Sequence, residues 1–150
     1  MPANAAPIFT LTPNTGFAII TTAAANVSSA GGGTVGTDIF KVFTAGANGS
    51  FIQRLRFMSA ASAAAVVGVA TVLRVFLSTV GSGATAAANT QLIAEVSVPA
   101  ISSAHSTGAT NYYDVPLNFA IPTGYFLHVT QHVAQTANQN WVATAIGGDY

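Results

Sequence analysis

The sequence predicts an all-β fold made of antiparallel sheets, either a β-sandwich or a β-barrel. Short runs rich in β-branched and aromatic residues recur along the chain, and loops of glycine, asparagine, proline and other small residues separate them. No clear helical pattern lies between these runs, whereas parallel strands would need such crossover helices. With 51% hydrophobic residues in a chain of 150, residues 1–150 can bury the core of a single domain.

The pattern predicts eight or nine strands. In chain order the nine candidate runs are 8–12, 16–23, 38–45, 49–58, 69–80, 91–99, 111–119, 125–133 and 141–146. The segments 24–37, 81–90 and 100–110 are rich in small and polar residues and predict loops. We also expect residues 1–15 to include an extended N-terminal segment.

Turn residues predict how some of these runs are connected. Asn48-Gly49 favours a type I′ turn, so the third and fourth runs are predicted to form a hairpin. Pro13-Asn14 predicts a turn between the first two runs, and Pro122-Thr123-Gly124 predicts another before the eighth. Pro116 has no N–H to donate, so the seventh run is predicted to be an edge strand or to contain a bulge.

Alternation along the runs predicts which side chains face the core. The residues predicted to point inward or to share one face are Phe51, Leu55 and Phe57, then Leu73, Val75 and Leu77, then Leu92, Ala94, Val96 and Val98. Arg54 and Arg56 are then predicted to point outward together. Several runs are apolar on both faces, so second-face residues such as Phe76, Ile93 and Phe126 need a cover. Either a partner subunit or a thicker core within the chain would provide one.

The scarcity of charge favours a protein that works inside an assembly. The chain has four Lys or Arg and four Asp or Glu residues and no net charge, so most of its surface must be neutral. A chain without a basic field is not expected to bind nucleic acid or anionic membranes. The most apolar stretch, 57–73, is too short and too diluted by small residues for a membrane span, and the N-terminus lacks the pattern of a signal peptide. There is no cysteine for a disulfide or a thiolate metal site.

Two patterns resemble chemical sites, and neither meets the requirements of its chemistry. Residues 31–36 match G-x-G-x-x-G, but the strand-like run 38–45 follows where a dinucleotide site needs a helix. His128 and His132 lie four residues apart in a strand-like run, which places the rings roughly 13 Å apart, too far for one metal ion.

The carboxylates are also unlike those of an active site. They lie singly on separate segments, as Asp38, Glu95, Asp114 and Asp149, and no G-x-S-x-G motif is present. We therefore expect no enzyme activity, no catalytic residues, no cofactor and no metal. Asn26 and Asn48 match the glycosylation sequon, although Asn48 is better explained by its turn. Trp141 is predicted to anchor the core of the last strand.

Three segments resemble small virion proteins of tailed bacteriophages. They are 36–57 (GTDIFKVFTAGANGSFIQRLRF), 116–129 (PLNFAIPTGYFLHV) and 141–150 (WVATAIGGDY), which cover under a third of the chain. The resemblance implies a jelly-roll-like β-sandwich, such as a capsid decoration or cement protein. It also implies a homo-oligomer, with a trimer favoured, that binds a major capsid or other virion protein. Such a subunit would reside in the virion after assembly in the host cytoplasm.

Two other functions stay open. A carbohydrate-binding or adhesive module would place Trp141, Tyr112, Tyr113 and Tyr125 in an exposed aromatic strip. A pilus or surface-layer subunit would instead form open filaments or sheets. If the chain is a virion protein, we expect its contact with the particle to be mainly apolar. The alternative is that Arg54 and Arg56 together bind an acidic partner.

Overall fold

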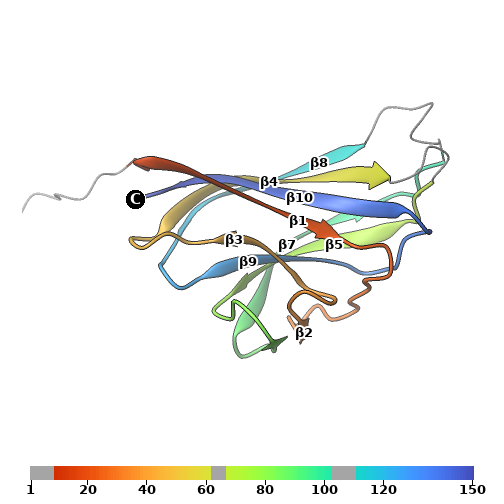
Figure 1. Cartoon of the computed structure of the whole chain (residues 1–150), viewed down its shortest axis with the longest axis horizontal. Coiled ribbons are helices and arrows are strands. Elements are labelled where there is room, and N and C mark those ends of the chain that lie inside the picture. The colour runs from red at the N-terminus through yellow and green to blue at the C-terminus, as the bar shows by residue number, and fades with distance from the viewer. Residues whose placement is uncertain (1–8, 62–66, 103–110) are drawn as a thin grey trace, which may run out of the picture.

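Two four-stranded antiparallel sheets make up the molecule and pack face to face (Figure 1). This computed structural model describes residues 9–61, 67–102 and 111–150. The first sheet has the order β1-β10-β4-β8 and the second has the order β3-β9-β5-β7. The strands of the first sheet are β1 (Thr12–Ile20), β10 (Gln139–Asp149), β4 (Ser50–Ala61) and β8 (Tyr112–Ile121). Those of the second are β3 (Phe40–Thr44), β9 (Phe126–Gln131), β5 (Thr71–Ser78) and β7 (Thr90–Val98).

The strand order is that of a jelly roll. Among the eight long strands, the first pairs with the last, the second with the seventh, the third with the sixth and the fourth with the fifth. This nesting is what results when one long hairpin is folded over into two sheets. The predicted all-β, jelly-roll-like sandwich is confirmed. Two further strands of two residues each, β2 (Gly33–Thr34) and β6 (Ala84–Thr85), form a small separate ribbon.

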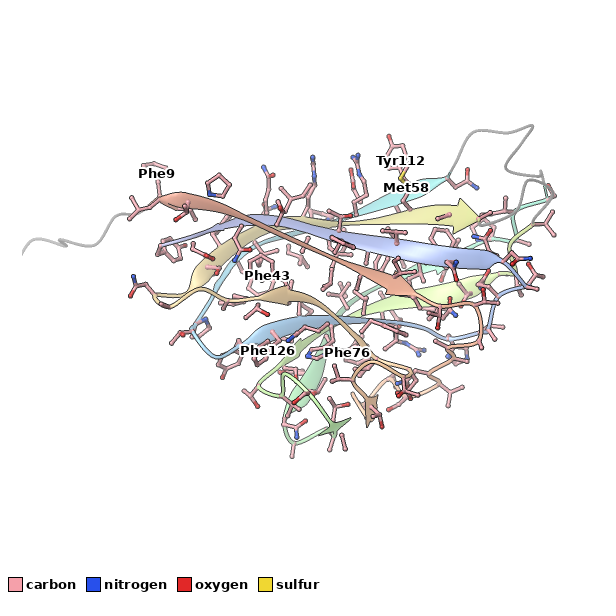
Figure 2. The ribbon with its side chains drawn as sticks, in the orientation of Figure 1. Phe9, Phe43, Met58, Phe76, Tyr112 and Phe126 are labelled. Atoms are coloured by element: carbon pink, nitrogen blue, oxygen red, sulfur yellow. The ribbon has the colours of Figure 1, made fainter. Side chains whose placement is uncertain are left out.

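The core lies between the two sheets. Trp141 is fully buried, as predicted, and its ring centroid lies 6.0 Å from that of Tyr113. Phe57 of β4 and Phe43 of β3 belong to the same core cluster, and Figure 2 shows Phe43 between the two sheets. Burial of each such side chain contributes about 1.5–3 kcal/mol. The described residues contain no helix that could span a membrane.

The turn predicted at Pro13-Asn14 does not form. β1 continues through both residues, with Pro13 opposite Gly148 of β10. β1 is an edge strand and pairs within its sheet with β10 alone. A proline is tolerated there because one side of an edge strand needs no ladder donor. β1 therefore takes only Thr12 from the first predicted run, together with residues 16–20 of the second. Residues 1–8 of the predicted N-terminal segment lie outside the described residues, as do residues 103–110 of the predicted loop 100–110.

The hairpin predicted at Asn48-Gly49 is wrong. β3 and β4 belong to different sheets, so residues 45–49 form a corner between the layers. The Gly49 N–H donates to the Gly46 carbonyl at 3.1 Å, and Gly49 has a φ of 89°. Asn48 has no positive φ, although a type I′ turn needs one at both central residues. A glycine-containing turn allows the chain to reverse, but the long pairings of β4 with β10 and β8 decide its sheet.

Bulges change the predicted alternation in β4 and β7. A register shift between Ile52 and Arg54 makes the Ile52 side chain point into the core, although Phe51 was predicted to do so. Leu55 and Phe57 are buried as predicted. A similar shift opposite Val75 and Phe76 in β5 places Ile93, rather than Leu92, against the core. The inward positions of Leu73 and Val75, and of Ala94, Val96 and Val98, are confirmed.

Pro116 lies where its chemistry predicts. β8 is an edge strand of its sheet, and Pro116 pairs with Arg54 next to the bulge. The turn at Pro122-Thr123-Gly124 also forms, with the Tyr125 N–H donating to the Pro122 carbonyl at 3.4 Å and a φ of 79° at Gly124.

Loops of the chain cover the two middle strands, β9 and β5, on the outer side of the second sheet. The loops around β2 and β6 lie on that side (Figure 1), and Phe76 and His128 beneath them are fully buried. The Asn26 N–H, for instance, donates to the carbonyl of Gln131 at the end of β9 at 2.8 Å. The cover that Phe76 was predicted to need is thus provided within the chain, and Ile93 faces the core. Phe126 is half-buried.

Candidate functional site

The glycine segment 31–36 contains the short strand β2 and is followed by β3 instead of a helix. Asp38 holds this segment in place, because its carboxylate accepts hydrogen bonds from the Thr34 N–H at 2.6 Å and from the Asn26 side-chain amide at 3.2 Å. A negative side chain here is unfavourable for a bound phosphate. The segment therefore acts as a structural loop against the second sheet.

The two histidines have separate partners. His128 is buried on the outer side of β9, where its Nε2 lies 2.9 Å from the Val80 carbonyl oxygen. Burial lowers the pKa of His128 to about 4, with a smaller lowering by Lys41, although the hydrogen bond to Val80 opposes the shift. His132 instead has its Nδ1 3.1 Å from Nη1 of Arg74. No group of three metal-ligating side chains occurs in the part of the chain that the structure describes.

Each of the four carboxylates is also held separately. Asp114 accepts two hydrogen bonds of 2.7 Å from Arg56, and Glu95 lies 3.3 Å from the Arg74 guanidinium. The hydrogen bonds from Arg56 hold the pKa of Asp114 below its usual value. Asp149 accepts hydrogen bonds from Ser50 and from Asn14, the latter at 2.8 Å. Together with Asp38, these groups stabilise strands and loops rather than facing one another across a cleft.

The aromatic strip of the carbohydrate hypothesis does not form. Trp141 is fully buried and Tyr113 packs against the core, whereas Tyr112 is 58% exposed on the other side of β8. Tyr125 lines a separate hollow of about 600 Å³ beside the start of β7, together with Asn89, Gln91 and Leu92. No charged residue lines this hollow.

The two sequons lie in different surroundings. Asn26 is buried, and its side-chain amide donates to the Gly32 carbonyl at 2.9 Å, so it is not accessible for glycosylation. Asn48 is exposed at the corner between β3 and β4.

The outer face of the first sheet, meaning the side of β1, β10, β4 and β8 away from the core, is the most distinctive surface. Register places its side chains in rows across all four strands. The three rows are Ile19, Val142, Met58 and Tyr112; Phe17, Thr144, Arg56 and Asp114; and Thr15, Ile146, Arg54 and Pro116. Sequence alternation identified the outward arginines, but only the strand order brings the apolar residues beside them.

Large apolar side chains are exposed on this outer face. Phe17 is 73% exposed, Ile19 50% and Met58 44%. Figure 2 shows Met58 and Tyr112 pointing away from the sandwich, and Phe9 lies just before β1 on the same side. Monomeric soluble proteins rarely leave a contiguous patch of this kind uncovered, and such patches commonly mark interaction sites.

The two arginines of the outer face differ in their hydrogen-bond partners, and the face carries a net positive charge. Arg56 is held by Asp114 and lies 4.7 Å from the centroid of the Tyr112 ring. Arg54 has a buried Nε atom with no hydrogen-bond partner among the described residues. Two arginines and one aspartate give this face a formal charge of +1, although the whole chain is neutral.

The sequence matches no protein-family model and no curated protein. Among solved structures, the chain is similar to part of dimeric latent PorU from Porphyromonas gingivalis, with 13% identity and a TM-score of 0.35. That match covers 97% of this chain and 14% of the PorU chain.

Proposed function

We propose that this chain is a structural subunit of a virus particle, a capsid decoration or cement protein that binds the shell and stabilises it. The observation that carries the proposal is the asymmetry of the sandwich. Loops of the chain bury Phe76 and His128 on the outer side of the second sheet, whereas the outer face of the first sheet exposes Phe17, Ile19, Met58 and Tyr112. A stable fold gains nothing from exposing such a face to water, but an assembly protein uses it to bind.

The fold and the polar residues support the same function. Jelly rolls occur in viral capsid proteins and in lectins, although a fold alone does not determine function. The histidines and carboxylates of the described residues are engaged in structural contacts, which favours a binding role over a catalytic one. Sparse charge also lowers the repulsion between closely packed copies.

The test is binding to particles. Purified protein is mixed with capsid shells of tailed bacteriophages that lack their decoration protein, and bound protein is measured by sedimentation. We expect saturable binding and a higher melting temperature of the shell. Shells that neither bind the protein nor gain stability, across a panel of such phages, would contradict the proposal.

The same preparation tests the oligomeric state. We expect the isolated chain to form a closed oligomer, with a trimer favoured, because its sparsely charged surface offers little repulsion between copies. Multi-angle light scattering at micromolar concentration should report three times 15.1 kDa. A stable monomer at that concentration would contradict this expectation without affecting shell binding.

The hollow beside β7 favours one second candidate, a site for a neutral sugar. Its wall combines the Tyr125 ring with the amides of Asn89 and Gln91, and its lining includes no charged residue. Rings and amides of this kind suit a polyhydroxylated ligand without charge. Binding on a glycan array that Tyr125→Ala abolishes would favour this function over the virion proposal.

A further inference from the structure

Arg54 is the cation of the outer face whose Nε atom has no hydrogen-bond partner in the described residues, although its charge also acts on Asp114. The chain has four Lys or Arg residues. Arg56 and Arg74 each have a carboxylate, and the Lys41 ammonium lies 5.3 Å from the centroid of the Phe126 ring. The Nε atom of Arg54 is buried and makes no hydrogen bond. A buried donor of a charged group is normally satisfied, so the Arg54 guanidinium is incompletely paired. Because Nε itself is covered, an acceptor on a partner would pair with the rest of this half-buried guanidinium.

The neighbours of Arg54 on the outer face do not provide an acceptor for its Nε atom. Ile146 and Pro116 lie directly opposite it on the adjacent strands. Asp114 lies one row away, and each of its two carboxylate oxygens already accepts a hydrogen bond from Arg56. Arg56 thus holds Asp114 in a bidentate pair, which is the most favourable geometry for these groups.

We propose that the outer face binds a protein surface that is apolar and carries a carboxylate, and that this carboxylate pairs with Arg54. The inference rests on the proposed function, in that the shell is the intended partner, and it adds the binding face and the chemistry of the bound surface. A second copy of the chain fits less well, because two equal faces of charge +1 would repel each other and Asp114 is already engaged.

The size of the face suits such a contact. β1 has nine residues, and four strands lie side by side in this sheet, so the face measures roughly 600 Å² at about 3.4 Å per residue and about 4.8 Å between strands. Specific interfaces bury about 800 Å² on each partner. The exposed apolar side chains therefore provide contact area, and Arg54 provides orientation.

One experiment tests the face without the shell. Two small probes of opposite charge, 2-naphthoate and 2-naphthylmethylammonium, are titrated into the isotope-labelled protein and followed by NMR. We expect naphthoate to shift the Arg54 Nε–H signal and the backbone signals of Phe17 and Met58. The ammonium probe should leave the Arg54 signal unchanged. Equal shifts with both probes, or shifts of naphthoate elsewhere only, would overturn the inference.

A second experiment uses the shell and matched variants. Arg54→Met removes the charge and keeps an unbranched apolar side chain, and Lys41→Met makes the same change on β3 of the other sheet. We expect Arg54→Met to weaken shell binding at least tenfold and Lys41→Met to leave it within twofold. Equal binding by both variants would overturn the inference and leave the proposed function intact. If the wild type binds no shell but naphthoate still selects Arg54, the proposed function fails and the chemistry of the face stands.

Discussion

Gly49 occupies a position that only glycine fits. Its φ is 89°, and a Cβ atom there would lie 2.8 Å from the Ile121 carbonyl oxygen. Gly124 has a similar φ of 79° but open space around its Cα hydrogens. We expect Gly49→Val to lower the free energy of unfolding by about 1–3 kcal/mol through backbone strain alone, with a further loss from the contact with Ile121. Gly124→Val should lose only the strain. Urea unfolding of both variants measures the difference, and equal losses would show that the corner adapts to the new side chain.

His128 makes the stability depend on pH. Burial lowers its pKa in the folded protein to about 4, whereas an unfolded histidine has a pKa of 6.5. Between these values the unfolded chain binds more protons, so the stability that is present above pH 6.5 is lost as the pH falls towards 4. The loss should be on the order of 2–3 kcal/mol.

The measurement for His128 is urea unfolding at pH 7 and pH 5. His128→Gln keeps a neutral donor that can approach the Val80 carbonyl and removes the titration. This variant should lose stability at pH 7 but show a flatter dependence on pH. The same slope in the variant and the wild type would assign the pH dependence to other groups.

At the scale of strands, the sequence predicted which segments are extended much better than how they pair. The runs 69–80, 91–99 and 141–146 each correspond to a strand of the sandwich, because alternation and β-branched content are local properties. The corner at Asn48-Gly49 shows where local information ends. The same residues suit a hairpin or a passage between sheets, and the choice depends on distant pairings such as that of β4 with β10.

Bulges limit prediction of the site in a similar way. The alternation correctly placed Arg56 outward, but it could not show that the exposed Met58 lies between Val142 and Tyr112. One inserted residue reverses which face of the sheet each later side chain of the strand points to, as the bulge at Ile52 shows. The outer face is assembled from four strands that are distant in sequence, so no single segment carries its signal.

Substitution of two phenylalanines tests whether the outer side of the second sheet is covered within the chain and the outer face of the first sheet is exposed. Phe76 is fully buried on the outer side of the second sheet, and Phe17 is 73% exposed on the outer face of the first. We expect Phe76→Ala to cost about 3–5 kcal/mol and Phe17→Ala to cost less than about 1 kcal/mol. Phe17→Ala should instead weaken shell binding. Thermal and urea unfolding measure the first pair of values. A large loss of stability in Phe17→Ala would show that the outer face is already covered within the molecule.

At the scale of the whole molecule, the sparse charge determines how the proposed complex responds to salt. An apolar contact contributes about 2.5 kcal/mol for each 100 Å² buried, before the costs of association. A single exposed ion pair contributes only about 0–1 kcal/mol. In molar salt the screening length is about 3 Å, so charges farther apart than this hardly interact. The pair that we propose at Arg54 would be enclosed by Ile146 and Pro116 on neighbouring strands, which reduces this screening.

We therefore expect protein bound to the shell to stay bound in about 1 M NaCl. Sedimentation of the assembled material at low and high salt measures the fraction released. Arg54→Met should bind the shell more weakly at both salt concentrations. The variant loses an ion pair that is buried in the complex, and salt screens such a pair much less than it screens a long-range electrostatic field. Extensive release of the wild type in salt would show that charge dominates the contact. If Arg54→Met with Arg56→Met then abolished the salt dependence, the two arginines would be the main contact, and the apolar rows would only position them.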